Sequence, residues 1–324
     1  MKIFITGASG FIGGAIARHL HPTHELVAMA RSRESAEKIL ALGINAINCS
    51  LSTVTPNHVA DCQAVIHAAA FVSASGSREQ FWQTNVAGTK RLTAAASLAG
   101  ARRFIHISTE SVLFHGQPLR SIDESYPYPE KTPFLYSETK AEAERLVLAA
   151  NQPDQGFATI ALRPRLVWGP GDQTILPVVT HMAQDGGFFW FNNGEALTST
   201  AYIDNVVHAV ELALTARANG KPYFITDDEI WCVKDFLTAY AATQGITLPN
   251  RSLPAGPMRL LGRFTGGVWR LFNMKSEPPL TELAVAAMSA DCTLKIDNAR
   301  KDLGYKPILT VAQGLEKMKN QHPS

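Results

Sequence analysis

The feature that most constrains this chain is a glycine-rich turn between a short apolar run and an amphipathic helix, close to the start of the sequence. Lys2–Thr6 predicts a buried strand, Phe11–Leu20 predicts a helix, and glycines recur at Gly7, Gly10 and Gly13. Glycines at this spacing let the backbone turn tightly and approach a pyrophosphate, which then lies at the helix N-terminus. Spaced glycines can also mark an ordinary turn, but the strand before them and the helix after them favour a dinucleotide-binding loop.

Apolar runs typical of strands alternate with helical patterns through the first half of the chain. Such alternation implies right-handed crossovers between parallel strands. The predicted fold class is therefore α/β, a doubly wound parallel sheet of the Rossmann type. The predicted strands are Lys2–Thr6, His24–Ala30, Ala64–Ala68, Arg103–Ser108 and Thr159–Arg163, and the predicted helices are Phe11–Leu20, Ser35–Leu42, Phe81–Ala99 and Ser137–Ala149.

The pattern changes after Arg163, where prolines and glycines become frequent and most of the remaining chain is predicted to be helical. A helix near Asp204–Ala216 and a strand at Tyr223–Thr226 predict a return to the sheet. The rest would form a smaller lobe over the carboxyl edge of the sheet, where open α/β sheets bind ligands. The expected division is a dinucleotide-binding domain over 1–165, to which 201–226 returns, and a mostly helical substrate-binding lobe over 166–200 and 227–324.

Composition excludes several classes of protein. The 324 residues include 30 Lys and Arg against 28 Asp and Glu, and without a basic run this near-neutral balance argues against a nucleic-acid surface. With 46% hydrophobic residues the chain is too apolar for disorder. The uncharged stretch Ile3–Ala17 is too short and too rich in glycine for a transmembrane segment or a secretory signal. Scattered cysteines without metal-ligand spacing predict reduced thiols, no metal and a cytoplasmic location.

The residues after the second predicted strand distinguish the two nicotinamide dinucleotides. An NAD(H) site usually has an acidic residue there to bind the ribose 2′-hydroxyl, whereas this chain has Arg31, Ser32 and Arg33. Two guanidinium groups and a hydroxyl could hold a 2′-phosphate, and no carboxylate is present to repel it. Both arginines could instead be solvated loop charges. The missing acid and the added bases together favour NADP(H) over NAD(H).

A tyrosine and a lysine stand one helical turn apart at Tyr136 and Lys140, so both project from one helix face. A free phenol has a pKa near 10, and a neighbouring ammonium and a positive nicotinamide ring would both pull that pKa toward neutral pH. Tyr136 would then exchange a proton with an alcohol or ketone during hydride transfer at the nicotinamide. Such pairs also occur on ordinary amphipathic helices, but the place of this one, after a glycine loop and several strands, favours catalysis.

Hydroxyl groups follow the strand Arg103–Ser108, at Ser108, Thr109 and Ser111. They could be ordinary caps at a strand end. Because they lie at the carboxyl edge of the predicted sheet, one of them is also placed to hydrogen-bond the reacting oxygen.

Further motifs match a single family, in order along the chain. They are His67–Ala70, Thr84–Thr89, Leu162–Pro164, Trp168–Asp172, Tyr202–Val207 and Leu303–Pro307. With the glycine loop and Tyr136/Lys140, the chain resembles the extended short-chain dehydrogenase/reductases of the NAD-dependent epimerase/dehydratase superfamily over nearly its whole length. It looks most similar to the 3β-hydroxysteroid dehydrogenase-like branch. The resemblance implies a dehydrogenase/reductase that acts on CH–OH groups.

The resemblance also implies roles for individual residues. The family places its catalytic hydroxyl three residues before a valine, here Thr109, so Thr109, Tyr136 and Lys140 are the expected catalytic residues. Lys140 would also hold the nicotinamide ribose, and Asn85 would support the nicotinamide side. The expected cofactor contacts are Gly7, Ser9, Gly10, Phe11, Ile12, Gly13, Arg31, Arg33, Ser50, Leu51, Ala68, Ala69, Asn85, Tyr136, Lys140, Pro164 and Val167.

The chain departs from the family pattern in two places. Members often have Asp-Leu after the third pairing strand, where the acid touches adenine, and this chain has Ser50-Leu51. The sugar-nucleotide dehydratases typically read Thr-Asp-Glu at the catalytic hydroxyl, where both acids perform elimination. Thr109-Glu110-Ser111 lacks the second acid, which counts against dehydratase chemistry.

Two apolar segments concern the substrate, the aromatic run Phe188–Phe191 and the stretch Arg259–Phe272. In the second, large apolar residues recur every four positions. Such a stretch could be a lid over an apolar substrate, a helix at a membrane surface or part of the core. The recurring residues are Leu260, Phe264, Val268 and Phe272.

The leading hypothesis is an NADP(H)-dependent oxidoreductase that interconverts a secondary alcohol and a ketone, or an aldehyde, on a sterol- or lipid-like molecule. One alternative is a nucleotide-sugar epimerase with tightly bound NAD, which uses the same tyrosine and lysine. Another is a non-catalytic NADP(H) sensor on the same scaffold. The resemblance further implies a homodimer through the helices predicted at Phe81–Ala99 and Ser137–Ala149.

Overall fold

The computed structural model describes residues 1–73, 76–271 and 280–321. Its centre is a parallel sheet in the order β12-β7-β5-β4-β1-β2-β3. The chain runs outward from β1 to β3 and then crosses back to β4, so a crevice opens where β1 and β4 end, at the switch point of the topology. The strands are β1 (Lys2–Thr6), β2 (Glu25–Ala30), β3 (Asn45–Asn48), β4 (Ala64–His67), β5 (Arg103–Ile107), β7 (Ala158–Pro164) and β12 (Lys221–Ile225).

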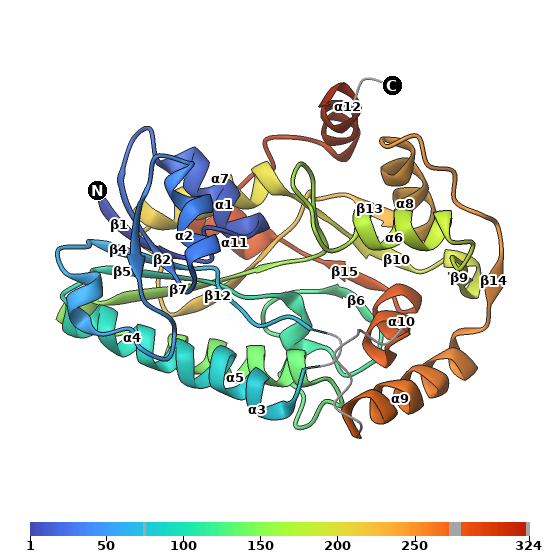
Figure 1. The fold of residues 1–324 in the computed structure, drawn as a ribbon, viewed down its shortest axis with the longest axis horizontal. Coiled ribbons are helices and arrows are strands. Elements are labelled where there is room, and N and C mark those ends of the chain that lie inside the picture. Colours follow the sequence, from blue (N-terminus) through green and yellow to red (C-terminus); the bar gives the residue numbers. More distant parts are fainter. Residues whose placement is uncertain (74–75, 272–279, 322–324) are drawn as a thin grey trace.

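Helices cover both faces of this sheet, which confirms the predicted doubly wound fold (Figure 1). In the view of Figure 1 one layer lies above the sheet and the other below it. The upper layer contains α1 (Phe11–Leu20), α2 (Arg33–Leu40), α7 (Ile203–Thr215) and α11 (Asp297–Leu303), and the lower layer contains α4 (Thr89–Leu98) and α5 (Leu135–Ala149).

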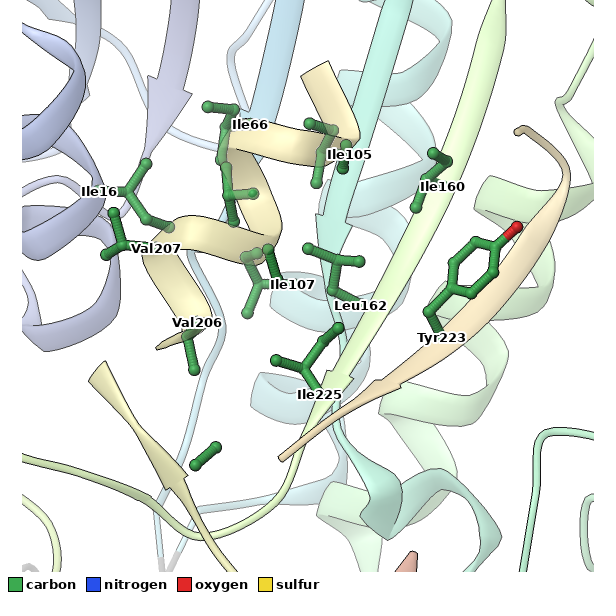
Figure 2. Close-up of a cluster of buried hydrophobic side chains, with 14 of the residues drawn as sticks. Ile16, Ile66, Ile105, Ile107, Ile160, Leu162, Val206, Val207, Tyr223 and Ile225 are labelled. Carbon is green, nitrogen blue, oxygen red and sulfur yellow. The ribbon is translucent and has the colours of Figure 1, made fainter. Parts of the chain in front are cut away.

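Two apolar cores lie on the two faces of the sheet, since successive strand residues point to opposite sides. Ile105 and Ile107, two residues apart on β5, face α7, where Val206 and Val207 pack near them (Figure 2). Phe104, the residue before Ile105, points to the other face and belongs to the core between the sheet and helices α4 and α5. Strands that are buried on both faces consist of continuous apolar runs in the sequence. Most strands of this sheet could therefore be predicted.

Two elements of the main sheet and its helix layers differ from the sequence prediction. The edge strand β3 was not predicted, because Asn45–Asn48 is polar at both ends and only partly buried. The predicted helix Phe81–Ala99 begins earlier, with α3 (Arg78–Phe81), and widens into a π-helical segment, η2 (Trp82–Gly88), before α4. Such wide turns are rare in helices and are often found beside functional sites.

The smaller lobe contains a second sheet, in the order β13-β10-β15-β6, and several helices. β6 lies within the range expected for the dinucleotide-binding domain, yet it pairs with β15, near the C-terminus, in a region predicted to be mostly helical. The elements are β6 (Leu119–Ile122), β10 (Leu197–Ser199), β13 (Ile230–Cys232), β15 (Cys292–Leu294), the paired β8 (Val167–Trp168) and β11 (Ala201–Tyr202), the paired β9 (Trp190–Phe191) and β14 (Ser252–Leu253), and the helices α6 (Leu176–Gln184), α8 (Val233–Ala242), α9 (Ala255–Leu271), α10 (Glu282–Ser289) and α12 (Val311–Gln321).

The buried carboxylate of Asp227 joins the two lobes. It accepts hydrogen bonds from Trp168 Nε1 at 2.9 Å, Thr200 Oγ1 at 2.7 Å, Tyr202 N at 2.6 Å and Asn205 Nδ2 at 2.8 Å. Three of these donors belong to, or lie beside, the motifs at Trp168–Asp172 and Tyr202–Val207. These motifs therefore hold the smaller lobe against the edge of the main sheet.

The two apolar segments expected near the substrate have different environments. Phe188 and Trp190 are buried in the core of the smaller lobe, around Trp168. Leu260 and Phe264 on α9 are each 70% exposed, so this helix face is not part of the core. The side chains of Val268 and Phe272, the other members of the repeat, lie outside the described residues. Within the described ranges no helix is both long and apolar enough to cross a membrane.

Candidate active site

The loop between β1 and α1 brings its backbone very close to the end of β4. Gly7 has φ +78°, and a Cβ there would lie 2.8 Å from the backbone nitrogen of Ala69. A Cβ on Gly13 would overlap the carbonyl oxygen of Gly7. Gly10, the N-cap of α1, provides no side-chain cap for the first amide groups of the helix. A turn this tight, with free amides behind it, fits a pyrophosphate group.

A cleft of about 470 Å³ follows this loop across the ends of β1, β2, β3 and β4, a size typical of small-molecule sites. It brings together eight of the predicted cofactor contacts: Gly7, Ser9, Gly10, Arg31, Ser50, Leu51, Ala68 and Ala69. Its other lining residues are Met29, Ser35, Ser52, Ala70, Gln83 and Thr84.

The two arginines predicted to bind a 2′-phosphate are separated in the structure. Arg31 lines the cleft together with Ser35. Arg33, in contrast, begins α2, is 93% exposed and pairs with Glu37 one turn later at 2.8 Å. The Ser32 hydroxyl caps the same helix through Ser35. The structure thus brings Arg31 to the cleft but not Arg33.

Other predicted contacts lie outside the cleft. Phe11 and Ile12 pack toward the core of the smaller lobe. Asn85, in the π-helical segment, is buried and holds the chain after β4, because its Oδ1 accepts from Phe71 N at 2.7 Å and its Nδ2 donates to Phe71 O at 3.1 Å. Pro164 is the last residue of β7, at the carboxyl end of the sheet, and Val167 begins β8 three residues later.

Two of the three predicted catalytic residues, Tyr136 and Thr109, are in contact where the chain after β5 approaches the start of α5. Tyr136 lies in the first turn of α5 and hydrogen-bonds Thr109, which follows β5. A hydrogen bond between the Ser111 and Ser137 hydroxyls, 2.7 Å long, joins the same two segments. The local sequence placed Thr109 at the sheet edge and Tyr136 on a helix face, and the packing of α5 against Glu110–Leu113 brings them together.

Lys140 is buried one turn beyond Tyr136. Its Nζ donates to the carbonyl oxygen of Ile107 at 2.7 Å and lies 3.3 Å from Nε2 of His106. Burial lowers the pKa of Lys140 to about 8, although the negative charge of Glu144 acts in the opposite direction. The ammonium therefore has fixed partners and a pKa close to neutral.

The pKa of Tyr136 differs from the sequence prediction. Removal of the phenol from water, followed by the negative charge of Glu110, raises this pKa well above its ordinary value, while a hydrogen bond with Thr109 lowers it. The expected lowering by Lys140 is not seen, because the ammonium is directed to Ile107 and His106. Within the protein itself, Tyr136 is held as a neutral phenol, a form that can donate a proton.

A second cavity, about 100 Å³, opens beside Tyr136 between the start of α5, α9 and α10. Its wall combines apolar side chains with polar ones, two of them charged, and it lies on the side of the smaller lobe where a substrate was expected. Its described lining residues are Ser73, Gly76, Phe81, Pro133, Phe134, Leu135, Tyr136, Gly262, Arg263, Thr281, Glu282 and Leu283.

Buried polar groups next to the site were missed by sequence reasoning. Arg165 pairs with Glu110 beside Thr109. His67 links Thr6 and Thr89 through its two ring nitrogens, each at 2.8 Å, and burial, with the charge of Lys140, lowers its pKa to about 3. Nothing in the local sequence around Glu110, Arg165 or His67 predicts these contacts, so only the packing of the folded chain shows them. Within the described part of the chain no cluster of three or more His, Cys, Asp or Glu residues could hold a metal.

Comparison with solved structures defines the class of fold. UDP-glucuronic acid 4-epimerase from Bacillus cereus, solved with NAD, superposes with a TM-score of 0.75 at 20% identity over 99% of both chains. UDP-glucose 4-epimerase from Thermotoga maritima superposes with the same score at 17% identity, over 99% of this chain and 98% of that one. The chain therefore shares the fold of these nucleotide-sugar epimerases.

Sequence comparison identifies the branch. The model of the 3-beta hydroxysteroid dehydrogenase/isomerase family matches residues 4–255, and the chain belongs to this family. A ketoreductase of 4-hydroxy-2-methyl-3-oxo-4-farnesyl-3,4-dihydroquinoline-1-oxide from Stigmatella aurantiaca is 37% identical over all of this chain and 97% of its own. A 2-alkyl-3-oxoalkanoate reductase from Stenotrophomonas maltophilia is 33% identical over 98% of both chains. The protein is therefore a dehydrogenase/reductase that acts on hydroxyl or keto groups with a nicotinamide cofactor.

Proposed function

We propose that this protein uses NADP(H) to interconvert a ketone and a secondary alcohol on an apolar, lipid-like molecule. The observation that carries the proposal is the meeting of Tyr136 and Thr109 beside the cavity under α9 and α10. A carbonyl group in that cavity would reach the phenol, and the rest of the substrate would lie against the smaller lobe. The ketoreductases among the relatives support the same reaction class.

The chemistry assigns one task to each residue. When bound, the cofactor would supply the hydride that the carbonyl carbon accepts. Tyr136 donates its phenol proton to the carbonyl oxygen, so that the C=O bond becomes CH–OH and a phenolate remains. Thr109 holds the reacting oxygen beside the phenol. Lys140, whose ammonium is held by Ile107 O beside His106, is assigned to the nicotinamide ribose, and a proton from solvent restores the phenol.

The preference for NADP(H) rests on Arg31. Its guanidinium lines the cleft next to the glycine loop, and neither Ser32 nor Ser35 offers a carboxylate in the place where an NAD(H) site usually has one. A guanidinium can form two parallel hydrogen bonds to a phosphate. Arg33 is assigned no role, because it pairs with Glu37 at the surface.

The substrate class follows from the cavity and the relatives. The walls next to Tyr136 include Phe81, Phe134, Leu135 and Leu283, which suit a hydrocarbon chain or ring. Two relatives are named for keto compounds with a farnesyl group or an alkyl chain. We infer that the natural substrate is a β-keto compound of this lipid-like kind.

A test of this function compares Tyr136→Phe with the unmodified protein in NADPH oxidation assays on long-chain 2-alkyl-3-oxo acids and prenylated cyclic ketones. Loss of the proton donor should lower kcat by about 10²–10⁴-fold and leave the Kd for NADPH unchanged. Tyr126→Phe, which removes a hydroxyl with no hydrogen bond to the site residues, is the matched control and should retain activity.

Two results would contradict the proposal. Full activity of Tyr136→Phe would exclude the phenol as proton donor. Isomerisation of a nucleotide sugar without net oxidation of NADPH would favour the epimerase alternative, which uses the same tyrosine and lysine.

A further inference from the structure

A buried ion pair lies directly against Thr109 and Tyr136. Nη1 of Arg165 is 2.6 Å from Oε1 of Glu110, and the two side chains are 9% and 7% exposed. Glu110 begins η3 (Glu110–Leu113), just after β5, and Arg165 follows β7, the neighbouring strand. Removing two charges from water is costly, so burial of such a pair is weak evidence of a purely stabilising role.

The second carboxylate oxygen of Glu110 accepts a hydrogen bond from the Thr109 hydroxyl. Oγ1 of Thr109 donates to Oε2 of Glu110 at 2.8 Å and accepts a hydrogen bond from Ser111 N at 3.2 Å. A hydroxyl has one proton to donate. Glu110 therefore competes with Tyr136 for this proton, and whenever Thr109 donates to Glu110 the hydrogen bond that lowers the pKa of Tyr136 is not made.

The charge of Glu110 acts on Tyr136 in the same direction. A negative charge nearby disfavours ionisation of a phenol. The positive charge on the same helix, Lys140, donates to Ile107 O, and Glu138 is paired with Arg78 at 2.5 Å on the surface. Among the described residues, the other charged groups next to Tyr136 are Arg165 beside Glu110, Arg263 on α9 and Glu282 on α10.

Arg165 extends the pair to the wall of the cavity. Its Nη2 donates to the carbonyl oxygen of Ala287 on α10 at 3.2 Å, and α10 contributes Glu282 and Leu283 to the cavity beside Tyr136. The next residue, Leu166, has φ +46°, a conformation that is strained for a side chain of this size and that turns the chain away from β7. The guanidinium therefore fixes the carboxylate and the cavity wall together.

We propose that Glu110 and Arg165 are positioning residues that keep Tyr136 in its proton-bearing form and so set the site for proton donation to a ketone. Glu110 opposes the phenolate through its charge and removes the Thr109 proton from Tyr136. Arg165 holds the carboxylate in place through the ion pair. The inference rests on the proposed function, because the protonated form of Tyr136 favours reduction of a ketone only if this residue is the proton donor.

The test measures ionisation of Tyr136 directly, in protein labelled with 3-fluorotyrosine, whose phenol ionises more readily than that of tyrosine. The ¹⁹F resonance of residue 136 is assigned from the signal absent in Tyr136→Phe and is followed as a function of pH. In Glu110→Gln the midpoint should fall by about one pH unit or more, because the negative charge is gone and the Arg165 charge remains.

Two further variants keep this experiment interpretable. Glu110→Gln/Arg165→Met removes both charges with little change in volume, and its midpoint should lie between those of Glu110→Gln and the unmodified protein. Glu138→Gln removes a charge from the helix of Tyr136 without touching Thr109, and its midpoint should not change. Unchanged midpoints in both Glu110 variants, or an equal fall in Glu138→Gln, would overturn the inference.

A kinetic measurement separates this inference from the proposed function. If the protein reduces the keto acids used above, the alkaline limb of the kcat/KM profile for reduction should move to lower pH in Glu110→Gln, while the KM for NADPH stays constant. If no ketone is reduced but the ¹⁹F midpoint falls as expected, the proposed function fails while the effect of the pair on Tyr136 stands. A profile that keeps its shape in an active Glu110→Gln protein would contradict the role in proton donation.

Discussion

At the scale of single residues, the two neighbouring arginines after β2 illustrate how position decides function. Both have the same charge and nearly the same local sequence, but Arg33 lies inside the first turn of α2 and Arg31 lies before its N-cap. The helix direction turns Arg33 toward Glu37 and leaves Arg31 at the cleft. The number of basic residues near the end of a strand therefore does not predict how many of their side chains reach a ligand.

Arg31→Ala should weaken binding of NADPH about tenfold or more, since a hydrogen bond to a charged group is worth about 1.5–3 kcal/mol. Binding of NADH should hardly change. Arg33→Ala is the matched control, because it removes the same charge two residues away without touching the cleft. Fluorescence titration with both cofactors measures these effects. Equal loss of affinity for NADH, or an equal effect of Arg33→Ala, would contradict the assignment of Arg31.

The pKa of Lys140 predicts a pH dependence of stability. Burial lowers this pKa from 10.5 to about 8 in the folded protein, so below pH 8 the folded state contains a charge that it disfavours. As the pH rises from 8 to 10.5, the folded protein loses this proton before the unfolded chain does, and the penalty disappears. Relative to Lys140→Met, the unmodified protein should gain about 3 kcal/mol in free energy of unfolding over this range. Denaturant unfolding at pH 7 and pH 10.5 measures the gain, and parallel curves for the two proteins would exclude it.

At the scale of elements, contact between α9 and α10 shapes the cavity beside Tyr136. A Cβ on Gly262 of α9 would lie 2.8 Å from the backbone nitrogen of Glu282, so the two helices approach through a glycine. Leu260 and Phe264, on the same helix, face outward. The apolar repeat in the sequence indicated an amphipathic helix, but the glycine between these residues determines which side meets the protein.

Gly262→Ala should push α9 away from α10, lower the free energy of unfolding by about 1–3 kcal/mol and raise the KM for the ketone, without changing the Kd for NADPH. Gly256→Ala, in the same helix, is the control, because a Cβ there meets nothing within 4 Å. That substitution should leave the KM unchanged and stabilise the protein by no more than about 1 kcal/mol. Similar effects of the two substitutions would show that helix propensity, and not the contact, is responsible.

At the scale of the whole molecule, buried polar side chains connect segments that are far apart in the sequence. Asn205 on α7 accepts from Ile308 N at 2.8 Å and Leu309 N at 3.0 Å, and it also donates to Asp227 at the end of the main sheet. A Cβ on Gly314 of α12 would lie 2.7 Å from the ring of Trp168. The family motifs in the second half of the chain thus build the junction between the lobes, while the proposed catalytic residues lie elsewhere.

Asp227→Ala should lower the free energy of unfolding by about 3 kcal/mol or more, because it leaves several buried donors without an acceptor. Asp185→Ala, which removes a carboxylate that is 64% exposed, should change stability by no more than about 0.5 kcal/mol. Chemical denaturation of the two variants measures the difference. A small effect at Asp227 would mean that the junction between the lobes rearranges.

The sequence by itself determined the class of fold and the placement of the glycine loop, Tyr136, Lys140 and Thr109, because these depend on local periodicity, on turn geometry and on spacing along one helix. Strands β3, β6 and β15 escaped prediction, since short strands with few apolar residues form only where a partner strand is present. The tertiary structure alone decided which arginine reaches the cleft, where the Lys140 ammonium is directed, and that Glu110 and Arg165 meet beside Thr109. Each of these is a contact between distant segments, whose energy depends on burial and distance and leaves no signal in the local sequence.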